Sequence, residues 1–233
     1  MRALVIVHDP GSDPVLVGDR LEHHGFTLDT FEITKVANNP SGSAAEFGDP
    51  TDYDMILPMG SIWSVYDTDR IGGWIGDELD FLRRADEADV PVLGVCFGAQ
   101  ALAAALGGRV VRSDQPQVGW HPLDIEIECG MPSGPWMQWH SDRFDPPTDA
   151  TILAQDHVGV QAFTVRRHLG VQFHPEVTRA HLDYWMDLSG TDELDDLGIN
   201  LADLLAETST REPEVRQRTN QLVDWFITDI AKF

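Results

Sequence analysis

The sequence predicts an α/β fold that combines a mostly parallel sheet with an inserted set of antiparallel strands and a C-terminal helical extension. Three observations support this prediction. Short β-branched apolar runs alternate with helical patterns up to residue 108, which is typical of strands joined by crossover helices. Strand-like runs separated only by turn residues follow between residues 109 and 173, and a helical pattern with one apolar face comes last.

The alternating elements lie in the first half of the chain. The run ALVIV indicates a buried strand, and the helical pattern after it has Ser12 or Asp13 as its expected N-cap, with Pro14 near the first turn. A polar stretch at residues 37–50 is expected to be a loop. In chain order, the expected elements are strands at 3–7, 27–33 and 53–61, a helix at 75–88, a strand at 91–95 and a helix at 99–106.

The second half of the chain changes character. Its strand-like runs RVVRS, LDIEIE, ATILAQ, VQAFTV and GVQFH are separated by turn residues, which indicates antiparallel pairing on the sheet. The Trp and Met residues between 136 and 139 are interpreted as packing residues. An acidic linker is expected at residues 187–198, followed by a packed helix. The residues that share the apolar face of this helix are Leu222, Trp225, Phe226, Ile230 and Phe233.

The charge balance limits the possible partners. The chain has 16 Lys and Arg residues against 39 Asp and Glu, a formal net charge of −23. Such a surface repels nucleic-acid phosphates and anionic lipids, so we expect neither a nucleic acid nor a membrane as a partner. The two cysteines form no metal-binding CxxC pair, and the N-terminal apolar run is too short for a signal peptide. We therefore expect a cytoplasmic protein without a metal or another cofactor.

The segment GVCFG, residues 94–98, is the first candidate for chemistry. A cysteine within an apolar run is usually a small buried hydrophobic residue, and this interpretation of Cys96 stays open from the run alone. The spacing also matches a G-x-nucleophile-x-G elbow between a strand and a helix, where glycines permit a tight turn. At such a turn the thiol would lie at a helix N-terminus, whose partial positive charge favours the thiolate.

A base for this nucleophile is found in the segment GVQFHPE. His174 and Glu176 are two residues apart, and in an extended chain such side chains point to the same side. Glu176 can then orient the His174 imidazole and stabilise its cationic form. The alternative is that Pro175 and Glu176 only begin the following helix, since both residue types are favoured in a first turn. Together, the two segments favour a Cys-His-Glu triad.

The segments PVLGVCFGAQ and GVQFHPE together resemble the motifs of the class I glutamine amidotransferases, a family whose glutaminase domain has a flavodoxin-like α/β fold. The resemblance covers about residues 1–185, and the helical tail resembles that of the single-domain, GMP-synthase-like members. It implies a class I glutamine amidotransferase domain at residues 1–187. Residues 188–233 would then be a helical extension packed on the same domain.

The resemblance also implies roles for individual residues. Cys96 would attack the glutamine side-chain amide, form a γ-glutamyl thioester and release ammonia, while His174 moves the protons and Glu176 orients it. The backbone N–H groups of Gly60 and Phe97 would stabilise the oxyanion. The expected substrate contacts are Gln100, Ser61, His140, Ser141 and Asp142.

Two segments depart from the family pattern. A Gly-Gly-Pro-like turn is replaced by PMGSIWSVYD, and a Ser-His-Gly-Asp-like segment is replaced by WHSD, residues 139–142. These departures concern the oxyanion loop and the substrate contacts. Cys129 is expected to be a bystander, and the sequence offers no partner for His8, His168 or His181.

The expected substrate is glutamine or another γ-glutamyl compound. The chain contains no ATP-binding P-loop, so the ammonia is expected to serve a separate synthase subunit. Two alternatives stay open. One is a free-standing γ-glutamyl hydrolase that acts on a glutamylated amine or peptide. The other is a catalytically silent binding protein, which the intact triad disfavours.

Overall fold

A mixed sheet forms the centre of the computed structural model, which describes residues 1–34, 46–126 and 129–233. The strands are ordered β2-β1-β3 in one part and β4-β10-β9-β8-β6 in the other, and a parallel bridge between Ile56 and Val92 joins the two parts. The strands that run parallel are β1 (Arg2–Val7), β2 (Thr27–Glu32), β3 (Met55–Pro58), β4 (Leu93–Val95) and β10 (His168–Val171).

The antiparallel strands extend one edge of this sheet. They are β9 (Val160–Val165), β8 (Thr151–Gln155) and β6 (Asp124–Ile125), which pair in succession beyond β10. A separate antiparallel ribbon pairs β5 (Arg109–His121) with β7 (Trp136–Asp145). The predicted α/β class with an antiparallel insertion is therefore confirmed.

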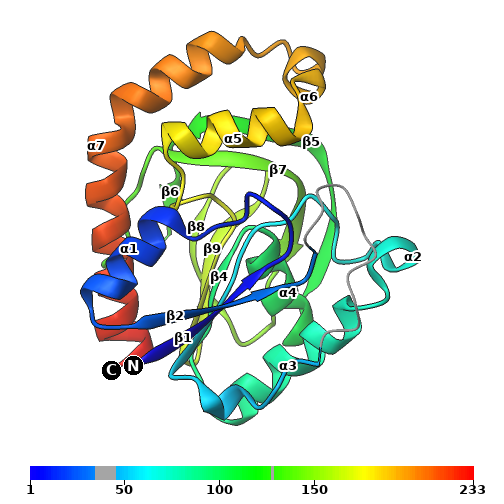
Figure 1. Cartoon of the computed structure of the whole chain (residues 1–233), viewed down its shortest axis with the longest axis vertical. Coiled ribbons are helices and arrows are strands. Elements are labelled where there is room, and N and C mark those ends of the chain that lie inside the picture. Colours follow the sequence, from blue (N-terminus) through cyan, green and yellow to red (C-terminus); the bar gives the residue numbers. More distant parts are fainter. Residues whose placement is uncertain (35–45, 127–128) are drawn as a thin grey trace.

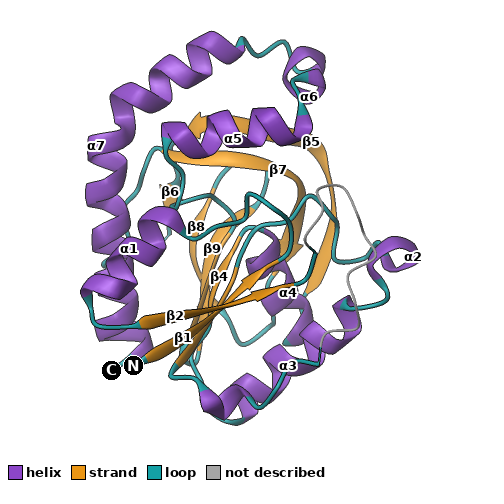
Figure 2. Cartoon of the chain, viewed as in Figure 1, coloured by secondary structure: helices purple, strands orange, loops and turns teal. Residues whose placement is uncertain are grey.

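Helices cover both faces of the sheet (Figures 1 and 2). The helices α1 (Val15–His23) and α7 (Leu201–Trp225) pack on one face, and α3 (Ile75–Glu87) and α4 (Phe97–Ala105) pack on the other. The helices α5 (Arg179–Ser189) and α6 (Asp192–Asp196) pack near β7, and their buried residues Leu182 and Leu194 share a cluster with Met137. The remaining elements are α2 (Thr68–Ile71), a 3₁₀ turn (Pro50–Asp52) and a π-helix (Phe226–Ala231).

The expected N-cap of α1 is wrong. Pro14 occupies the cap position, and no side chain caps the helix. Instead, the N–H of Leu16 donates to the carbonyl oxygen of Glu176 at 3.3 Å. A backbone carbonyl oxygen from a distant segment thus accepts a hydrogen bond from a free N–H group of the first turn, in place of a Ser12 or Asp13 side chain.

The C-terminal helix packs largely as its apolar face predicts. Leu222, Phe226 and Ile230 are buried, and Trp225 is half-buried. The expectation that Phe233 belongs to the packed face is wrong, since this residue is 45% exposed. The 3.6-residue period behind the prediction does not continue to this point, because residues 226–231 form a π-helix.

Three other expectations have different outcomes. The polar loop expected at 37–50 falls mostly outside the described residues, because these exclude 35–45. The expected linker at 187–198 contains α6, with Leu194 buried. The strand β7 was not predicted, because from Gln138 to Phe144 its buried positions alternate as Gln, His, Asp and Phe, a pattern that hydropathy does not reveal.

Candidate active site

Cys96 lies at the turn between β4 and α4. Its backbone angles, φ 51° and ψ −108°, are a strained conformation for a residue with a side chain. A Cβ atom on Gly94 would lie 2.7 Å from the carbonyl oxygen of Gly98, and one on Gly98 would overlap the carbonyl oxygen of Pro58. Both glycines of the elbow are therefore required by close backbone contacts.

Cys96 is 5% exposed and lies at the N-terminus of α4. The Gln172 side-chain amide donates to Cys96 Sγ at 3.6 Å, and the Gln100 amide in turn donates to Gln172 Oε1 at 3.2 Å. Sequence analysis gave Gln172 no role, although it stands two residues before His174 in an extended segment, a spacing that points both side chains to one side.

His174 and Glu176 form a buried pair. His174 Nδ1 lies 2.7 Å from Glu176 Oε1, and the side chains are 5% and 2% exposed. Burial lowers the pKa of the His174 imidazole, but the Glu176 carboxylate and then Cys96 more than offset it, so this pKa lies well above its usual range. His174 Nε2 is buried and has no hydrogen-bond partner among the described residues. It is therefore free to exchange a proton with a bound molecule.

Two helices hold the segment that carries this pair. The Thr219 hydroxyl of α7 donates to the carbonyl oxygen of Pro175 at 2.6 Å, and the Leu16 N–H of α1 donates to that of Glu176. His174 is also bound through its own N–H to the carbonyl oxygen of Met137 at 2.8 Å. The segment is therefore fixed from three sides, and it does not form the first turn of α5, which begins at Arg179.

The expected oxyanion donors, Gly60 and Phe97, lie next to the cysteine. Phe97 is the first residue of α4, so its N–H has no partner within the helix. A Cβ atom on Gly60 would lie 3.2 Å from His174 Cε1 and 3.9 Å from Cys96 Cβ. Gly60 therefore lies beside both side chains, with no room for a larger residue against His174.

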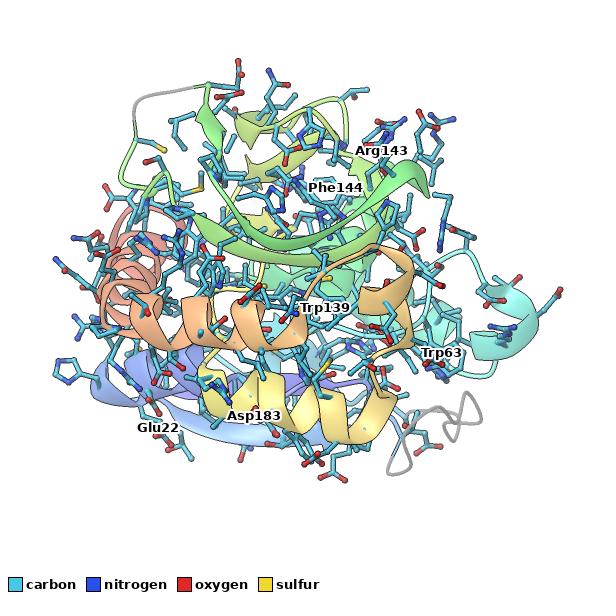
Figure 3. The ribbon with its side chains drawn as sticks, turned by 90° about the horizontal axis from the view of Figure 1, so that it is seen from above. Glu22, Trp63, Trp139, Arg143, Phe144 and Asp183 are labelled. Atoms are coloured by element: carbon cyan, nitrogen blue, oxygen red, sulfur yellow. The ribbon has the colours of Figure 1, made fainter. Side chains whose placement is uncertain are left out.

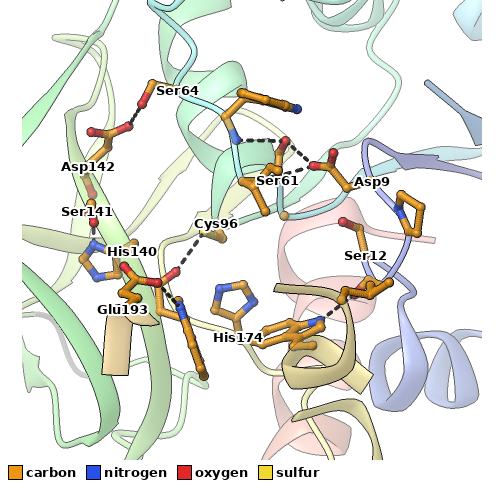
Figure 4. A pocket seen from close by; sticks show the side chains of 18 of the residues that line it. Asp9, Ser12, Ser61, Ser64, Cys96, His140, Ser141, Asp142, His174 and Glu193 are labelled. Carbon is orange, nitrogen blue, oxygen red and sulfur yellow. Dashed lines mark hydrogen bonds between the residues drawn. The ribbon is translucent and has the colours of Figure 1, made fainter. Parts of the chain in front are cut away.

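A cavity of about 380 Å³ opens onto these residues (Figure 4). It is lined by every candidate site residue except Phe97: Cys96, His174, Glu176, Gly60, Ser61, Gln100, His140, Ser141 and Asp142. Asp9 and Glu193, which sequence analysis did not single out, also line it, as does one cation, Arg112. The tryptophans Trp139 and Trp185 contact each other at its wall, and Figure 3 shows Trp139 beside the helices after residue 178.

The loop after β3 is tied to the cavity wall by hydrogen bonds. Asp9 Oδ2 accepts from the Ser61 hydroxyl at 2.6 Å and from the Ile62 N–H at 3.1 Å, while Asp9 Oδ1 is buried without a partner among the described residues. Asp142 accepts from the Ser64 hydroxyl and from the Tyr66 hydroxyl at 2.8 Å. The position of Asp9 at the carboxyl end of a parallel strand was the available signal for this residue.

His140 is buried in the wall and held in a neutral form. Its Nδ1 lies 2.9 Å from the carbonyl oxygen of Asp142, and its Nε2 lies 3.1 Å from Gln117 Oε1. Burial lowers the pKa of this imidazole to about 4. His140 is therefore uncharged at neutral pH and contributes shape and hydrogen bonding to the cavity rather than charge.

Within residues 1–34, 46–126 and 129–233, no three His, Cys, Asp or Glu side chains gather as a metal site. No helix of these ranges is long and apolar enough to cross a membrane.

The sequence and the fold of this chain are similar to those of known proteins. A family model described as glutamine amidotransferase class-I matches residues 18–184. The chain is similar to the glutamine-hydrolyzing GMP synthases of Thermomicrobium roseum, at 36% identity over 137 residues, and Aeropyrum pernix, at 39% over 115 residues. The aligned parts cover 54% and 43% of this chain and 24% and 22% of the relatives. The chain therefore matches less than a quarter of their length.

Two solved structures share the fold. A glutamine amidotransferase from Thermotoga maritima has a TM-score of 0.84 at 24% identity, with 97% of each chain covered. A glutamine amidotransferase from Methylobacillus flagellatus has a TM-score of 0.82 at 20% identity, with 98% of this chain and 95% of that chain covered. The family match includes the elbow and the segment of His174 and Glu176. The chain belongs to the class I glutamine amidotransferase family.

Proposed function

We propose that this protein hydrolyses the side-chain amide of glutamine through Cys96, His174 and Glu176. The observation that carries the proposal is the buried 2.7 Å contact between His174 and Glu176 beside the strained elbow of Cys96. A nucleophile, a base and a group that orients the base are the three parts that acyl transfer requires.

In the first step, the Cys96 thiolate adds to the amide carbon of glutamine. The carbonyl oxygen becomes an oxyanion, which the N–H groups of Gly60 and Phe97 stabilise. The intermediate collapses when its C–N bond breaks, and His174 Nε2 gives its proton to the departing nitrogen, which leaves as ammonia. The product bound to the enzyme is a γ-glutamyl thioester on Cys96.

In the second step, water adds to the thioester carbon while His174 Nε2 takes a proton from it. The C–S bond then breaks, and glutamate and the Cys96 thiolate are regenerated with imidazolium on His174. Glu176 accepts the Nδ1–H hydrogen bond throughout, which keeps Nε2 directed at the reacting atoms. The raised pKa of His174 suits this cycle, because it favours the imidazolium that must protonate the leaving nitrogen.

The polar lining of the cavity suits the α-amino and α-carboxylate groups of the substrate. The unpartnered Asp9 Oδ1 and the carboxylate of Asp142 provide acceptors for an ammonium group. Arg112 provides a cation for a carboxylate. Ser61, Gln100, His140 and Ser141 would complete the substrate contacts.

The released ammonia is proposed to serve a synthase on a separate chain. The parts of the GMP synthases that match this chain make up 24% and 22% of those relatives, and the relatives are named as glutamine-hydrolyzing. In this proposal, residues 1–187 form the amidotransferase domain, and residues 188–233 form a helical extension packed on it.

One observation favours a second candidate, a free-standing γ-glutamyl hydrolase. Besides Glu176, three carboxylates, those of Asp9, Asp142 and Glu193, line the cavity together with Trp63 and Trp139. An acidic and aromatic lining is suited to a cationic amine as the leaving group. A γ-glutamylated amine would then replace glutamine as the preferred substrate.

The experiment that tests both candidates measures ammonia or amine release by the purified chain. Glutamine and a panel of γ-glutamyl amides with neutral and cationic leaving groups serve as substrates, and Cys96→Ala and Cys129→Ala are the variants. We expect glutamine hydrolysis that Cys96→Ala abolishes and Cys129→Ala retains. Preferential cleavage of a cationic γ-glutamyl amide would select the hydrolase, and equal loss in both variants would contradict the triad.

A further inference from the structure

A second buried histidine–glutamate pair lies behind the oxyanion loop. His8 follows β1, Glu78 belongs to α3, and both side chains are fully buried. His8 Nε2 lies 3.0 Å from Glu78 Oε1 and 3.1 Å from Oε2, while His8 Nδ1 lies 3.2 Å from the carbonyl oxygen of Gly60. The imidazole therefore joins a helix on one face of the sheet to the loop beside Cys96.

The two neighbours of the ring fix the direction of its hydrogen bonds. The Gly60 carbonyl oxygen can only accept, so His8 Nδ1 must carry a hydrogen. Burial lowers the pKa of His8, but Glu78 more than offsets this and raises it above the usual range. The Nδ1–H group thus donates to the Gly60 carbonyl oxygen, while Nε2 faces the Glu78 carboxyl group.

The same imidazole contacts the other expected oxyanion donor. The His8 and Phe97 rings meet edge to face with centroids 4.7 Å apart, and Trp74 lies against His8 at 5.7 Å. Phe97 follows Cys96 directly and begins α4. The His8 side chain thus contacts both residues whose N–H groups would bind the oxyanion. It contacts Gly60 at the carbonyl oxygen and Phe97 at the ring.

A buried ion pair is a weak source of stability, because the cost of removing two charges from water offsets most of their attraction. Well-packed apolar residues would fill the same space with equal or greater stability. Fixed donors, in contrast, are what an oxyanion hole needs, since their value depends on being in place before charge develops. Because His8 of this pair contacts Gly60 and Phe97, we expect the pair to hold the oxyanion donors in position rather than to add stability to the fold.

We propose that His8, held by Glu78, is a positioning residue that fixes the Gly60 and Phe97 peptides in the orientation required to bind the oxyanion. This inference rests on the proposed glutaminase activity and extends it to two residues outside the cavity lining. His8 does not touch the reacting atoms. It acts by holding the Gly60 carbonyl, and with it the adjoining peptide groups of the loop.

The test compares His8→Phe, which keeps a ring but loses the donor, with His8→Asn, whose amide can still donate toward Gly60. The matched control is His168→Phe. His168 is also a buried histidine paired with a carboxylate, Asp86, at 2.8 Å, but its Nδ1 accepts from Val92 and has no contact with the oxyanion loop. Two variants test Glu78. Glu78→Leu removes the acceptor for His8 Nε2, and Glu78→Gln keeps an acceptor oxygen without the charge.

Three quantities are measured for each variant: kcat and KM for glutamine, thermal stability, and the rate at which iodoacetamide alkylates Cys96. Alkylation joins sulfur to carbon as iodide leaves, and no oxyanion forms. We expect His8→Phe to lower kcat by about 10- to 100-fold while KM changes by less than about threefold. The alkylation rate should stay within about twofold of wild type, and His8→Asn should recover part of kcat.

The outcomes separate this inference from the function on which it rests. If His168→Phe loses stability without losing kcat while His8→Phe loses kcat, the positioning role is supported. If His8→Phe folds and turns over like wild type, or if kcat and alkylation fall together, the role is wrong. If Glu78→Gln loses as much kcat as Glu78→Leu, Glu78 does not orient His8. A wild-type chain that alkylates at Cys96 but releases no ammonia overturns the proposed function itself.

Discussion

His174 Nδ1 lies 2.7 Å from Glu176 Oε1, and the other ring nitrogen of His174 is buried without a partner among the described residues. The glutamate therefore fixes which nitrogen is available for proton transfer. A neutral imidazole with its hydrogen on Nδ1 leaves the Nε2 lone pair facing the cavity, and an imidazolium presents an Nε2–H there. Both forms are needed in turn during amide hydrolysis.

The first prediction concerns the reactive thiol. A glutamine analogue that carries an electrophilic carbon should modify Cys96 and leave Cys129 unmodified at neutral pH, because only Cys96 combines a helix N-terminus with a neighbouring imidazole. Mass spectrometry of peptides from the treated protein locates the adduct. Excess glutamine should protect Cys96. Modification confined to Cys129 would falsify the assignment of the nucleophile.

The second prediction ranks the triad. Cys96→Ala should abolish turnover, and His174→Ala should come close to doing so. Glu176→Ala should retain measurable activity, with kcat reduced by about 100-fold, because an orienting group is less essential than the nucleophile or the base. Steady-state kinetics with glutamine provide the comparison. A folded Glu176→Ala variant with wild-type kcat would remove the orienting role.

The third prediction concerns Gln172, whose amide donates to Cys96 Sγ at 3.6 Å. Gln172→Met removes this donor with little change in length, and we expect kcat to fall by about two- to tenfold, since a hydrogen bond typically contributes about 0.5–1.5 kcal/mol. Gln138→Met is the matched control, because Gln138 is an equally buried amide that donates to Gln161 instead. Equal losses in the two variants would show that Gln172 acts through packing alone.

The fourth prediction concerns the elbow glycine Gly98. A Cβ atom at this position overlaps the Pro58 carbonyl oxygen, so Gly98→Ala should destabilise the fold by about 3 kcal/mol or more. Gly76→Ala is the control, because Gly76 lies in α3 with open space around it and should gain up to about 0.5 kcal/mol. Urea unfolding measures both changes. A Gly98→Ala variant as stable as wild type would contradict the close contact.

The fifth prediction is a pH dependence that originates in His140. Burial lowers its pKa from 6.5 to about 4 in the folded chain, so as the pH falls the unfolded chain binds the proton first. The contribution of His140 to stability is therefore present above pH 6.5 and is lost between pH 6.5 and about 4. Replacing it with Phe should reduce the fall in unfolding free energy over this range by about 3 kcal/mol. Superimposable pH curves would contradict this.

Local sequence rules were sufficient for the parts of the fold that local chemistry determines. The strand at ALVIV, the helix at 75–88 and the elbow around Cys96 each follow from apolar period and glycine spacing, and each is present. The wrong cap of α1 has a different origin. Its N-terminus is satisfied by the carbonyl of Glu176, a contact between residues far apart in the sequence that no local rule reveals.

The contacts of the candidate site also divide into those between residues close in the sequence and those between residues far apart. His174 and Glu176 are two residues apart, so their pairing is predictable from an extended chain. His8 and Glu78 are 70 residues apart in the sequence, and their contact depends on the packing of α3 against the end of β1. Asp9 and Gln172 were not predicted as site residues because their contacts, to Ser61 and to Cys96, join segments that are far apart in the sequence. The strand β7 was not predicted because its buried face is mostly polar.

The bond from Thr219 to Pro175 has a consequence for the order in which the protein is made. Cys96, His174 and Glu176 all precede Thr219 in the sequence, so a growing chain contains these residues before it contains the side chain that anchors Pro175. The segment of His174 and Glu176 can therefore gain this hydrogen bond only after α7 has been synthesised and has packed against it.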